Sequence, residues 1–246
     1  MKKLLSAILA AVLAVSLVGC GGGRDNNGRG QTDNPQEETK KVVNPVRSEL
    51  YDDQGTKLAD IEYEYDADGN RLSNTTYWVE SWGGGWEKDE YTYNSNGDML
   101  TKTASYSQYD GTSTMNYEYD ADGKLLKTYL EGDASMYTGY TYDENGHAVK
   151  RAMYYSDGSE NYPVELTCDR EGRIIQEKEV WESNGWVFIY KTTYDENGNI
   201  LKWEYSANGE VLLTHNYDYN NEGLLVRQDC SIESWKMEGY VLHYYE

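Results

Sequence analysis

Histidine, cysteine and proline are scarce in this chain of 246 residues, with three of each, and phenylalanine occurs once. His147, His215 and His243 are isolated and show no spacing typical of a metal site. We expect His147 to be solvated beside a turn and His215 to be packed. The sequence also lacks a Gly-x-Ser-x-Gly motif, a phosphate loop and a Cys–His pairing. We therefore expect no metal, no cofactor and no enzymatic activity.

Basic residues are few as well: 22 Lys and Arg stand against 43 Asp and Glu, a formal net charge of −21. From residue 49 onward the imbalance is larger, with 15 basic and 39 acidic residues. Nucleic-acid phosphates and anionic lipid headgroups both repel such a surface. We expect a solvated domain with no nucleic-acid partner. Carboxylate pairs are inevitable at this density, so they do not indicate glycosidase chemistry.

One apolar run, Leu4–Val18, has 15 residues, which is short for a membrane-spanning helix and suits a signal peptide. The run ends in the segment Leu17-Val18-Gly19-Cys20, which resembles the lipobox of bacterial lipoproteins. This implies cleavage before Cys20 and diacylglycerol on its sulfur; the alternative is a secretory signal with an incidental cysteine. We predict a signal peptide over 1–19, a flexible tether over 20–48 and an extracytoplasmic domain over 49–246, lipid-anchored in the cell membrane or the outer membrane.

The rest of the chain repeats. Tyr-Asp-x-x-Gly and close variants occur at Tyr51–Gly55, Tyr65–Gly69, Tyr93–Gly97, Tyr119–Gly123, Tyr142–Gly146, Cys168–Gly172, Tyr194–Gly198 and Tyr219–Gly223. After the first pair, successive glycines lie 23 to 28 residues apart, with a second turn signal such as Asn184-Gly185 between them. The chain thus reverses about every 13 residues, which leaves strands of about nine residues. We predict an all-β antiparallel meander of about 14–16 strands.

Apolar residues alternate within the strands that enter these turns, as at Ile61, Tyr63 and Tyr65. An aliphatic residue always stands three positions after the glycine, as Leu72 does. A four-residue loop over 66–69 would place Tyr63 opposite Leu72, on one face of the sheet; a three-residue loop would reverse that parity. We therefore predict the longer loop.

The two faces differ in polarity: tyrosine and leucine columns line one, and charged residues such as Glu62 and Glu64 line the other. An exposed aromatic face of this size would far exceed the apolar patches that soluble monomers tolerate. Sheets of more than about ten strands also tend to curl. We predict a curled sheet or a barrel-like closure around the Tyr/Leu-rich face, whose many tyrosine hydroxyls suit a wet lumen.

Three of the repeats, 65–72, 119–126 and 194–201, resemble the YD repeats of Rhs-type bacterial proteins. The resemblance covers about residues 49–226. It implies a long curling β-sheet and an association with carbohydrate binding. The largest members of that family wind into shells around a C-terminal toxin. This chain has far fewer repeats and ends at Glu246 without a toxin domain, so we expect the curling sheet without encapsulation.

Two other features are explained without a ligand. The acidic turns cluster carboxylates but supply only half of a calcium loop, so turn chemistry accounts for them. Cys168 and Cys230 lie about five strand spacings apart, on the order of 24 Å in an open sheet, whereas a disulfide needs Cα atoms within about 7 Å. We expect both thiols to be free.

The tryptophans are the best candidates for a binding site. Exposed indoles on a rigid sheet can stack on sugars, and interfaces favour Trp and Tyr. The candidate ligand-binding residues are Trp78, Trp82, Trp86, Trp181, Trp186 and Trp203. Alternatively, these rings cap the open ends of the aromatic interior. We predict a monomeric, non-enzymatic binding or adhesion module for glycan or protein; the alternative is an envelope scaffold, or a small-ligand carrier with an aromatic lumen.

Overall fold

A computed structural model describes residues 43–233 and 236–245. The expected signal peptide and Cys20 lie outside the described residues. The strands are β1 (Arg47–Asp52), β2 (Lys57–Tyr65), β3 (Arg71–Trp78), β4 (Trp86–Tyr93), β5 (Met99–Tyr106), β6 (Tyr109–Tyr119), β7 (Leu125–Leu130), β8 (Met136–Tyr142), β9 (Ala148–Tyr155), β10 (Glu160–Cys168), β11 (Ile174–Trp181), β12 (Trp186–Tyr194), β13 (Ile200–Ala207), β14 (Glu210–Tyr219), β15 (Leu225–Ile232) and β16 (Met237–Tyr244). A short 3-10 turn, η1 (Glu80–Trp82), joins β3 to β4.

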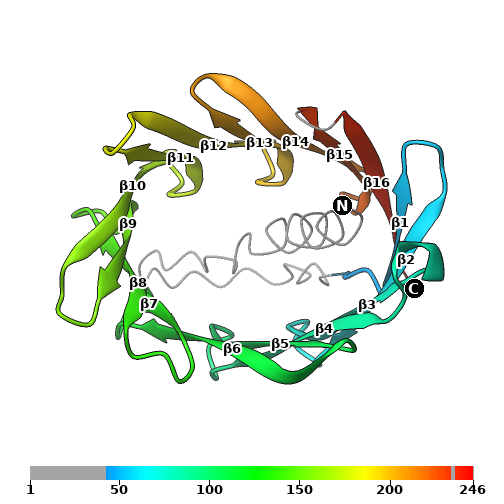
Figure 1. Cartoon of the computed structure of the whole chain (residues 1–246), viewed down its shortest axis with the longest axis horizontal. Coiled ribbons are helices and arrows are strands. Elements are labelled where there is room, and N and C mark those ends of the chain that lie inside the picture. Colours follow the sequence, from blue (N-terminus) through cyan, green and yellow to red (C-terminus); the bar gives the residue numbers. More distant parts are fainter. Residues whose placement is uncertain (1–42, 234–235, 246) are drawn as a thin grey trace, which may run out of the picture.

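The strands form a closed antiparallel barrel in chain order, an oval ring in Figure 1. Closure comes from β1 and β16, which pair from Arg47 with Tyr244 to Asp52 with Gly239. The predicted meander and its closure are thus confirmed. The first strand begins at Arg47, two residues before the domain boundary expected at residue 49. No helix in the described ranges is long and apolar enough to span a membrane.

The loop predicted in the Tyr-Asp-x-x-Gly turns is wrong in length. The Asp66 N–H donates to the Asn70 carbonyl at 2.9 Å and the Gly69 N–H to the Asp66 carbonyl at 3.2 Å. Only three residues therefore separate the bonded pair, as in a type I turn followed by a glycine bulge. Gly69 has φ of 86°, a conformation that costs glycine little.

A β-bulge just beyond the turn restores the parity of strand pairing that a four-residue loop would have given. Tyr65 pairs with Arg71 and Glu64 with Ser73, so Leu72 has no partner in the ladder. The same skip follows every repeat, at Leu58, Leu72, Leu100, Leu126, Val149, Ile175, Leu201 and Val226. The aliphatic position of the repeat is thus a bulge position. Bulges bend the strand and increase its twist, which helps a sheet to close.

The Tyr51 hydroxyl of the first repeat donates to Glu49, but the same bulge explains the tyrosine of the later repeats, from Tyr93 onward. Its hydroxyl donates to the backbone carbonyl of the first strand residue after the previous turn, where the bulge interrupts the ladder. The bonds are 2.7 to 3.3 Å long and join Tyr93 to Arg71, Tyr119 to Met99, Tyr142 to Leu125, Tyr194 to Ile174, Tyr219 to Ile200 and Tyr245 to Leu225. At Cys168 the thiol takes this place, 3.3 Å from the Ala148 carbonyl.

We call this series of hydrogen bonds from tyrosine hydroxyls to backbone carbonyls the tyrosine ladder, and it predicts an effect on stability. We expect Tyr119→Phe to lower the free energy of unfolding by about 1 kcal/mol, because it leaves the Met99 carbonyl without this partner. Tyr109→Phe is the matched control, because the Tyr109 side chain is 73% exposed and its ring contact with Tyr106 survives. Chemical denaturation would measure the free energy of unfolding of both variants. Equal losses of that free energy would contradict a specific role for the tyrosine ladder.

The main hydrophobic core lies at the seam where the barrel closes. It consists of Leu50, Leu58, Ala59, Trp78, Ile232 and Val241, with Trp82, Leu213, Cys230 and Met237 packed against it. On the other face of β1, the Glu49 carboxylate accepts hydrogen bonds from Tyr51, Tyr244 and Lys57 at 2.6 to 2.9 Å. These bonds lower the pKa of Glu49 to about 2. The seam is therefore held by packing on one face and by a charged network on the other.

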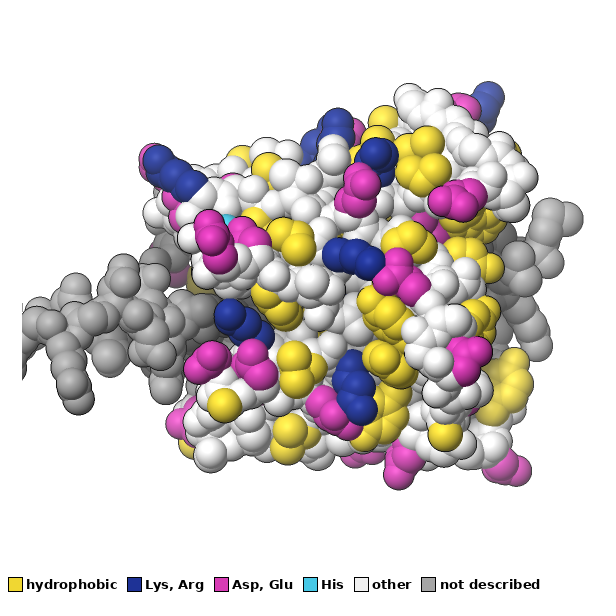
Figure 2. Space-filling view, turned by 90° about the vertical axis from the view of Figure 1, so that its left-hand side faces the viewer, with side chains coloured by type: hydrophobic (Ala, Val, Ile, Leu, Met, Phe, Trp, Pro, Cys, Tyr) yellow, Lys and Arg dark blue, Asp and Glu magenta, His cyan; other side chains and the backbone are white. Residues whose placement is uncertain are grey.

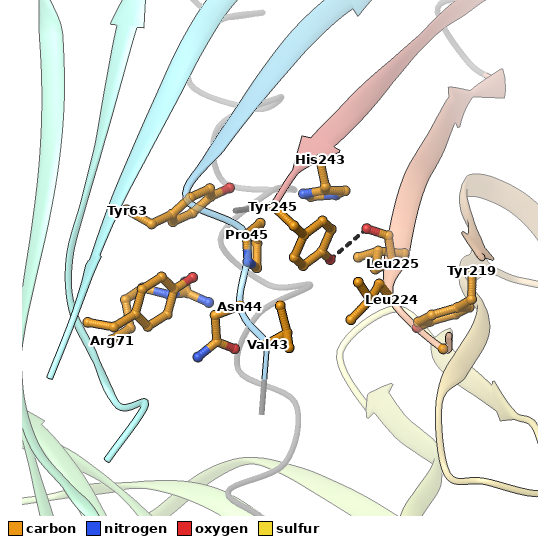
Figure 3. A pocket seen from close by; sticks show the side chains of 12 residues that line it. Val43, Asn44, Pro45, Tyr63, Arg71, Tyr219, Leu224, Leu225, His243 and Tyr245 are labelled. Atoms are coloured by element: carbon orange, nitrogen blue, oxygen red, sulfur yellow. Dashed lines mark hydrogen bonds between the residues drawn. The ribbon is translucent and has the colours of Figure 1, made fainter. Parts of the chain in front are cut away.

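The outer face mixes charges of both signs with isolated apolar side chains, as Figure 2 shows on the side of β7–β10. Lys127 pairs with Glu118 at 3.1 Å and Lys178 with Glu165 at 3.3 Å, each across neighbouring strands. Glu62 and Glu64 are exposed, while Tyr63 between them faces the interior (Figure 3). The predicted placement of Tyr63 and of the two glutamates is confirmed. The leucines of the bulge position differ from the prediction that they share the enclosed face, because Leu72 and Leu126 are 43% and 45% exposed.

Candidate binding site

The six candidate tryptophans occupy different environments. Trp78 is 7% exposed in the seam core and Trp82 packs against that core. Trp86 is 39% exposed and pairs with Tyr77. Trp203 contacts Tyr190 and His215 within a row of rings. Trp78 and Trp82 therefore pack in the hydrophobic core at the seam, whereas Trp181 and Trp186 are brought together elsewhere.

The turn between β11 and β12 positions Trp181 and Trp186 directly opposite each other. The Gly185 N–H donates to the Trp181 carbonyl at 2.7 Å, and the Asn184 side-chain oxygen accepts from the Trp186 N–H at 3.0 Å. Gly185 has φ of 72°. A short turn with glycine in the left-handed conformation thus holds one indole at the end of β11 and the other at the start of β12, 39% and 46% exposed.

Phe188, the single phenylalanine, joins the two indoles. Its ring centroid lies 4.8 Å from that of Trp181 and 5.9 Å from that of Trp186, and its side chain is only 8% exposed. The Tyr162 ring, 49% exposed, lies 6.2 Å from Trp181. We call these four residues, Tyr162, Trp181, Trp186 and Phe188, the aromatic platform. It presents three exposed rings around one buried ring.

Tyr162 is held in an unusual backbone conformation. Its φ is 48°, the pairing of β9 with β10 skips a step between Asn161 and Val164, and Pro163 follows. A bulky residue at positive φ is strained, and such strain persists where the surroundings fix it. The bulge directs the Tyr162 ring onto Trp181. The proline was the only local signal for it.

The platform continues into the barrel as a row of rings in contact. The nine rings are those of Tyr162, Trp181, Trp186, Phe188, Tyr205, Tyr190, Trp203, His215 and Tyr217. Burial raises the pKa of Tyr190 to about 12, so its hydroxyl stays protonated at neutral pH. His215, 1% exposed and bonded to Gln228 at 2.7 Å, is packed as predicted, and burial lowers its pKa to about 4.

Polar groups stand beside the platform. The Glu179 carboxylate accepts the Trp181 indole N–H at 2.5 Å, and the Arg151 side chain donates to Glu177 at 2.8 Å. Carboxylates beside exposed rings can accept hydroxyl hydrogens, while the rings stack on an apolar ring face. Phe188, Tyr162 and Glu179 were not among the predicted site residues. Glu179 and Phe188 each stand two positions from a tryptophan on its own strand, so side-chain alternation could have found them, whereas Tyr162 is brought in by the pairing of β10 with β11.

The remaining polar candidates behave as turn or packing residues. The Asp66 carboxylate accepts the N–H groups of Asp68 and Asn70 at 2.9 and 2.8 Å, which is turn chemistry. Within the described ranges, no group of three His, Cys, Asp or Glu residues could hold a metal ion. Cys168 and Cys230 are free thiols, as expected, and burial raises the pKa of Cys230 to about 12.

Comparison with known proteins gives both sequence and fold relatives. The tRNA3(Ser)-specific nuclease WapA of Bacillus spizizenii is 27% identical over 170 residues, 62% of this chain. The chain spans only 7% of the length of that relative. A porin-like protein from Bacteroides uniformis shares the fold, with a TM-score of 0.51 at 9% identity over 83% of this chain and 99% of its own. The Tc holotoxin pore of Photorhabdus luminescens covers 76% of this chain at 15% identity, with a TM-score of 0.33.

The family assignment agrees with the repeats described above. Residues 110–238, more than half of the chain, match the model of the teneurin YD-shell. That span contains repeats with the tyrosine ladder and the bulges, from β6 to β15. The chain therefore belongs to the teneurin YD-shell family.

Proposed function

We propose that this protein is a non-enzymatic binding module of the bacterial cell envelope that holds saccharides at its aromatic platform. The exposed, rigidly placed rings of Trp181, Trp186 and Tyr162 carry this proposal. Flat rings that are already ordered lose little entropy when they stack on a sugar, which favours binding. Glu179 beside them provides an acceptor for sugar hydroxyls.

Several features support an extracytoplasmic location. The lipobox-like segment before Cys20 supports a lipid anchor, and acyl chains on an N-terminal cysteine hold a protein stably at a membrane. The ion pairs on the outer face, such as Lys127 with Glu118, support a barrel surrounded by water. The acidic domain would be repelled from anionic headgroups. We infer a single barrel held off the membrane by its tether, with the platform free to meet a ligand.

A glycan array with the full chain would identify a ligand, and calorimetry with the best oligosaccharide would test the platform. We expect Trp186→Ala to weaken binding by about 2 kcal/mol, roughly 30-fold, because central tryptophans dominate such interfaces. Trp86→Ala is the matched control, because that indole is similarly exposed but lies at the start of β4, outside the platform. An array without hits, or equal losses in the two variants, would contradict the proposal.

A further inference from the structure

A second concave site lies inside the barrel, at the end that carries seven of the eight Tyr-Asp-x-x-Gly turns. Its cavity has a volume of about 230 Å³. Figure 3 shows Tyr63, Arg71, His243 and Tyr245 around it, and the Tyr245 hydroxyl donates to the Leu225 carbonyl at 2.7 Å. Successive turns of an antiparallel meander alternate between the two ends of the barrel, so this cavity and the aromatic platform lie at opposite ends.

Arg71 brings an uncompensated charge to this cavity. Its guanidinium lies 5.4 Å from the ring centroid of Tyr63 and 5.9 Å from that of Tyr91. Among the described residues no carboxylate forms an ion pair with it. Its guanidinium has the hydroxyls of Tyr65 and Tyr91 as hydrogen-bond partners, and its Nε is buried without a partner in the described ranges. Arg71 is half-buried, and a charge in such a place is stabilised less by neutral phenols than by a carboxylate. By contrast, Arg151, also in the barrel wall, is paired with Glu177 at 2.8 Å.

His243 adds a second unsatisfied group. Its Nδ1 lies 2.8 Å from the Ser48 hydroxyl, and its Nε2 is buried with no partner among the described residues. Burial and the charge of Arg71 lower the pKa of His243 to about 4, so the ring is neutral above that pH. When the Ser48 hydroxyl donates to Nδ1, the ring proton sits on Nε2 as a donor. Two groups on one cavity then lack an acceptor.

We propose that this cavity binds a small molecule with a carboxylate on a single six-membered ring. A carboxylate supplies the counter-charge that Arg71 lacks and acceptors for Arg71 and His243. The tyrosine rings of the wall, Tyr63 and Tyr65, offer flat apolar contact. At about 30 Å³ of liquid volume per water, the cavity of about 230 Å³ holds about eight waters, so the ligand is smaller than most cofactors. The site does not depend on the function of the platform.

Titration calorimetry with the full chain would test the site, using sodium benzoate, D-glucuronate, inorganic phosphate and D-glucose as probes. We expect at least one of the two carboxylates to bind and glucose not to bind. Arg71→Met should weaken carboxylate binding by about tenfold or more, because the counter-charge is lost. Arg151→Met, which removes a paired guanidinium, should leave it unchanged, and so should Trp186→Ala.

The thermal stability of the unliganded variants separates binding from folding. Removal of an unpaired charge should leave the melting temperature of Arg71→Met unchanged or raise it, whereas Arg151→Met should melt at a lower temperature because Glu177 loses its partner. A structural Arg71 would give the opposite result, with destabilisation by Arg71→Met. Three outcomes would overturn the proposal. They are destabilisation by Arg71→Met, binding of phosphate without binding of either carboxylate, and carboxylate binding that survives Arg71→Met.

Discussion

Leu58→Ala is expected to lower the free energy of unfolding by about 3 kcal/mol. Leu58 is 2% exposed and belongs to the seam core with Leu50, Trp78 and Val241. Truncation removes buried apolar contacts and leaves a cavity that the paired strands of a closed barrel cannot easily fill. Urea denaturation followed by tryptophan fluorescence would measure the loss.

Leu126→Ala is the control within the same repeat position. Leu126 occupies the corresponding bulge but is 45% exposed. Its truncation should change the free energy of unfolding by less than about 1 kcal/mol. If the two variants lost equal stability, the seam would not be the main core, and the repeats would contribute alike.

Gly239→Ala is the second change with a large expected effect. A Cβ on Gly239 would lie 2.7 Å from the Tyr51 carbonyl oxygen, which belongs to the backbone of the neighbouring strand β1. Because backbone cannot rotate away, β1 and β16 must separate. We expect a loss of about 2 kcal/mol, and faster amide hydrogen exchange in β1 than in strands remote from the seam.

Gly139→Ala tests whether the loss of stability in Gly239→Ala comes from contact with the backbone and not from crowding in general. A Cβ there would lie 2.9 Å from the Tyr154 ring, a side chain that can shift, in a strand pair remote from the seam. We expect less than half of the loss in Gly239→Ala. Equal losses, or unchanged exchange in β1, would show that closure does not depend on close approach at Gly239.

Part of the binding site was predictable because it is local in sequence. The Asn184-Gly185 turn places Trp181 and Trp186 opposite each other through contacts within six residues. Phe188 stands two positions after Trp186, so side-chain alternation puts it on the same face. Tyr162 joins them only through the pairing of β10 with β11, which no local pattern reveals. Arg71 and His243 are more remote still: they meet on one cavity because the first and last strands of the barrel pair.

The length of the loop in the Tyr-Asp-x-x-Gly turns could not be predicted from side-chain alternation alone. Alternation of Tyr63 and Leu72 was interpreted as a four-residue loop, but a three-residue loop followed by a bulge satisfies the same parity. The two solutions differ by one unpaired residue, and only backbone hydrogen bonds distinguish them. The function of the repeat tyrosine, which bonds to a carbonyl of the preceding repeat, was hidden for the same reason.

The order of residues along the chain was enough to determine the strands, the turns, the charged and aromatic faces and the sense of the meander, because side-chain alternation and glycine turns act over a few residues. Closure of the barrel decided which residues lie in the core, at the seam or around the cavity. Leu58 and Leu126 occupy the same repeat position, yet one is buried and the other is exposed. That difference arises where β1 meets β16, since contacts between chain ends are set by the curvature summed over all sixteen strands.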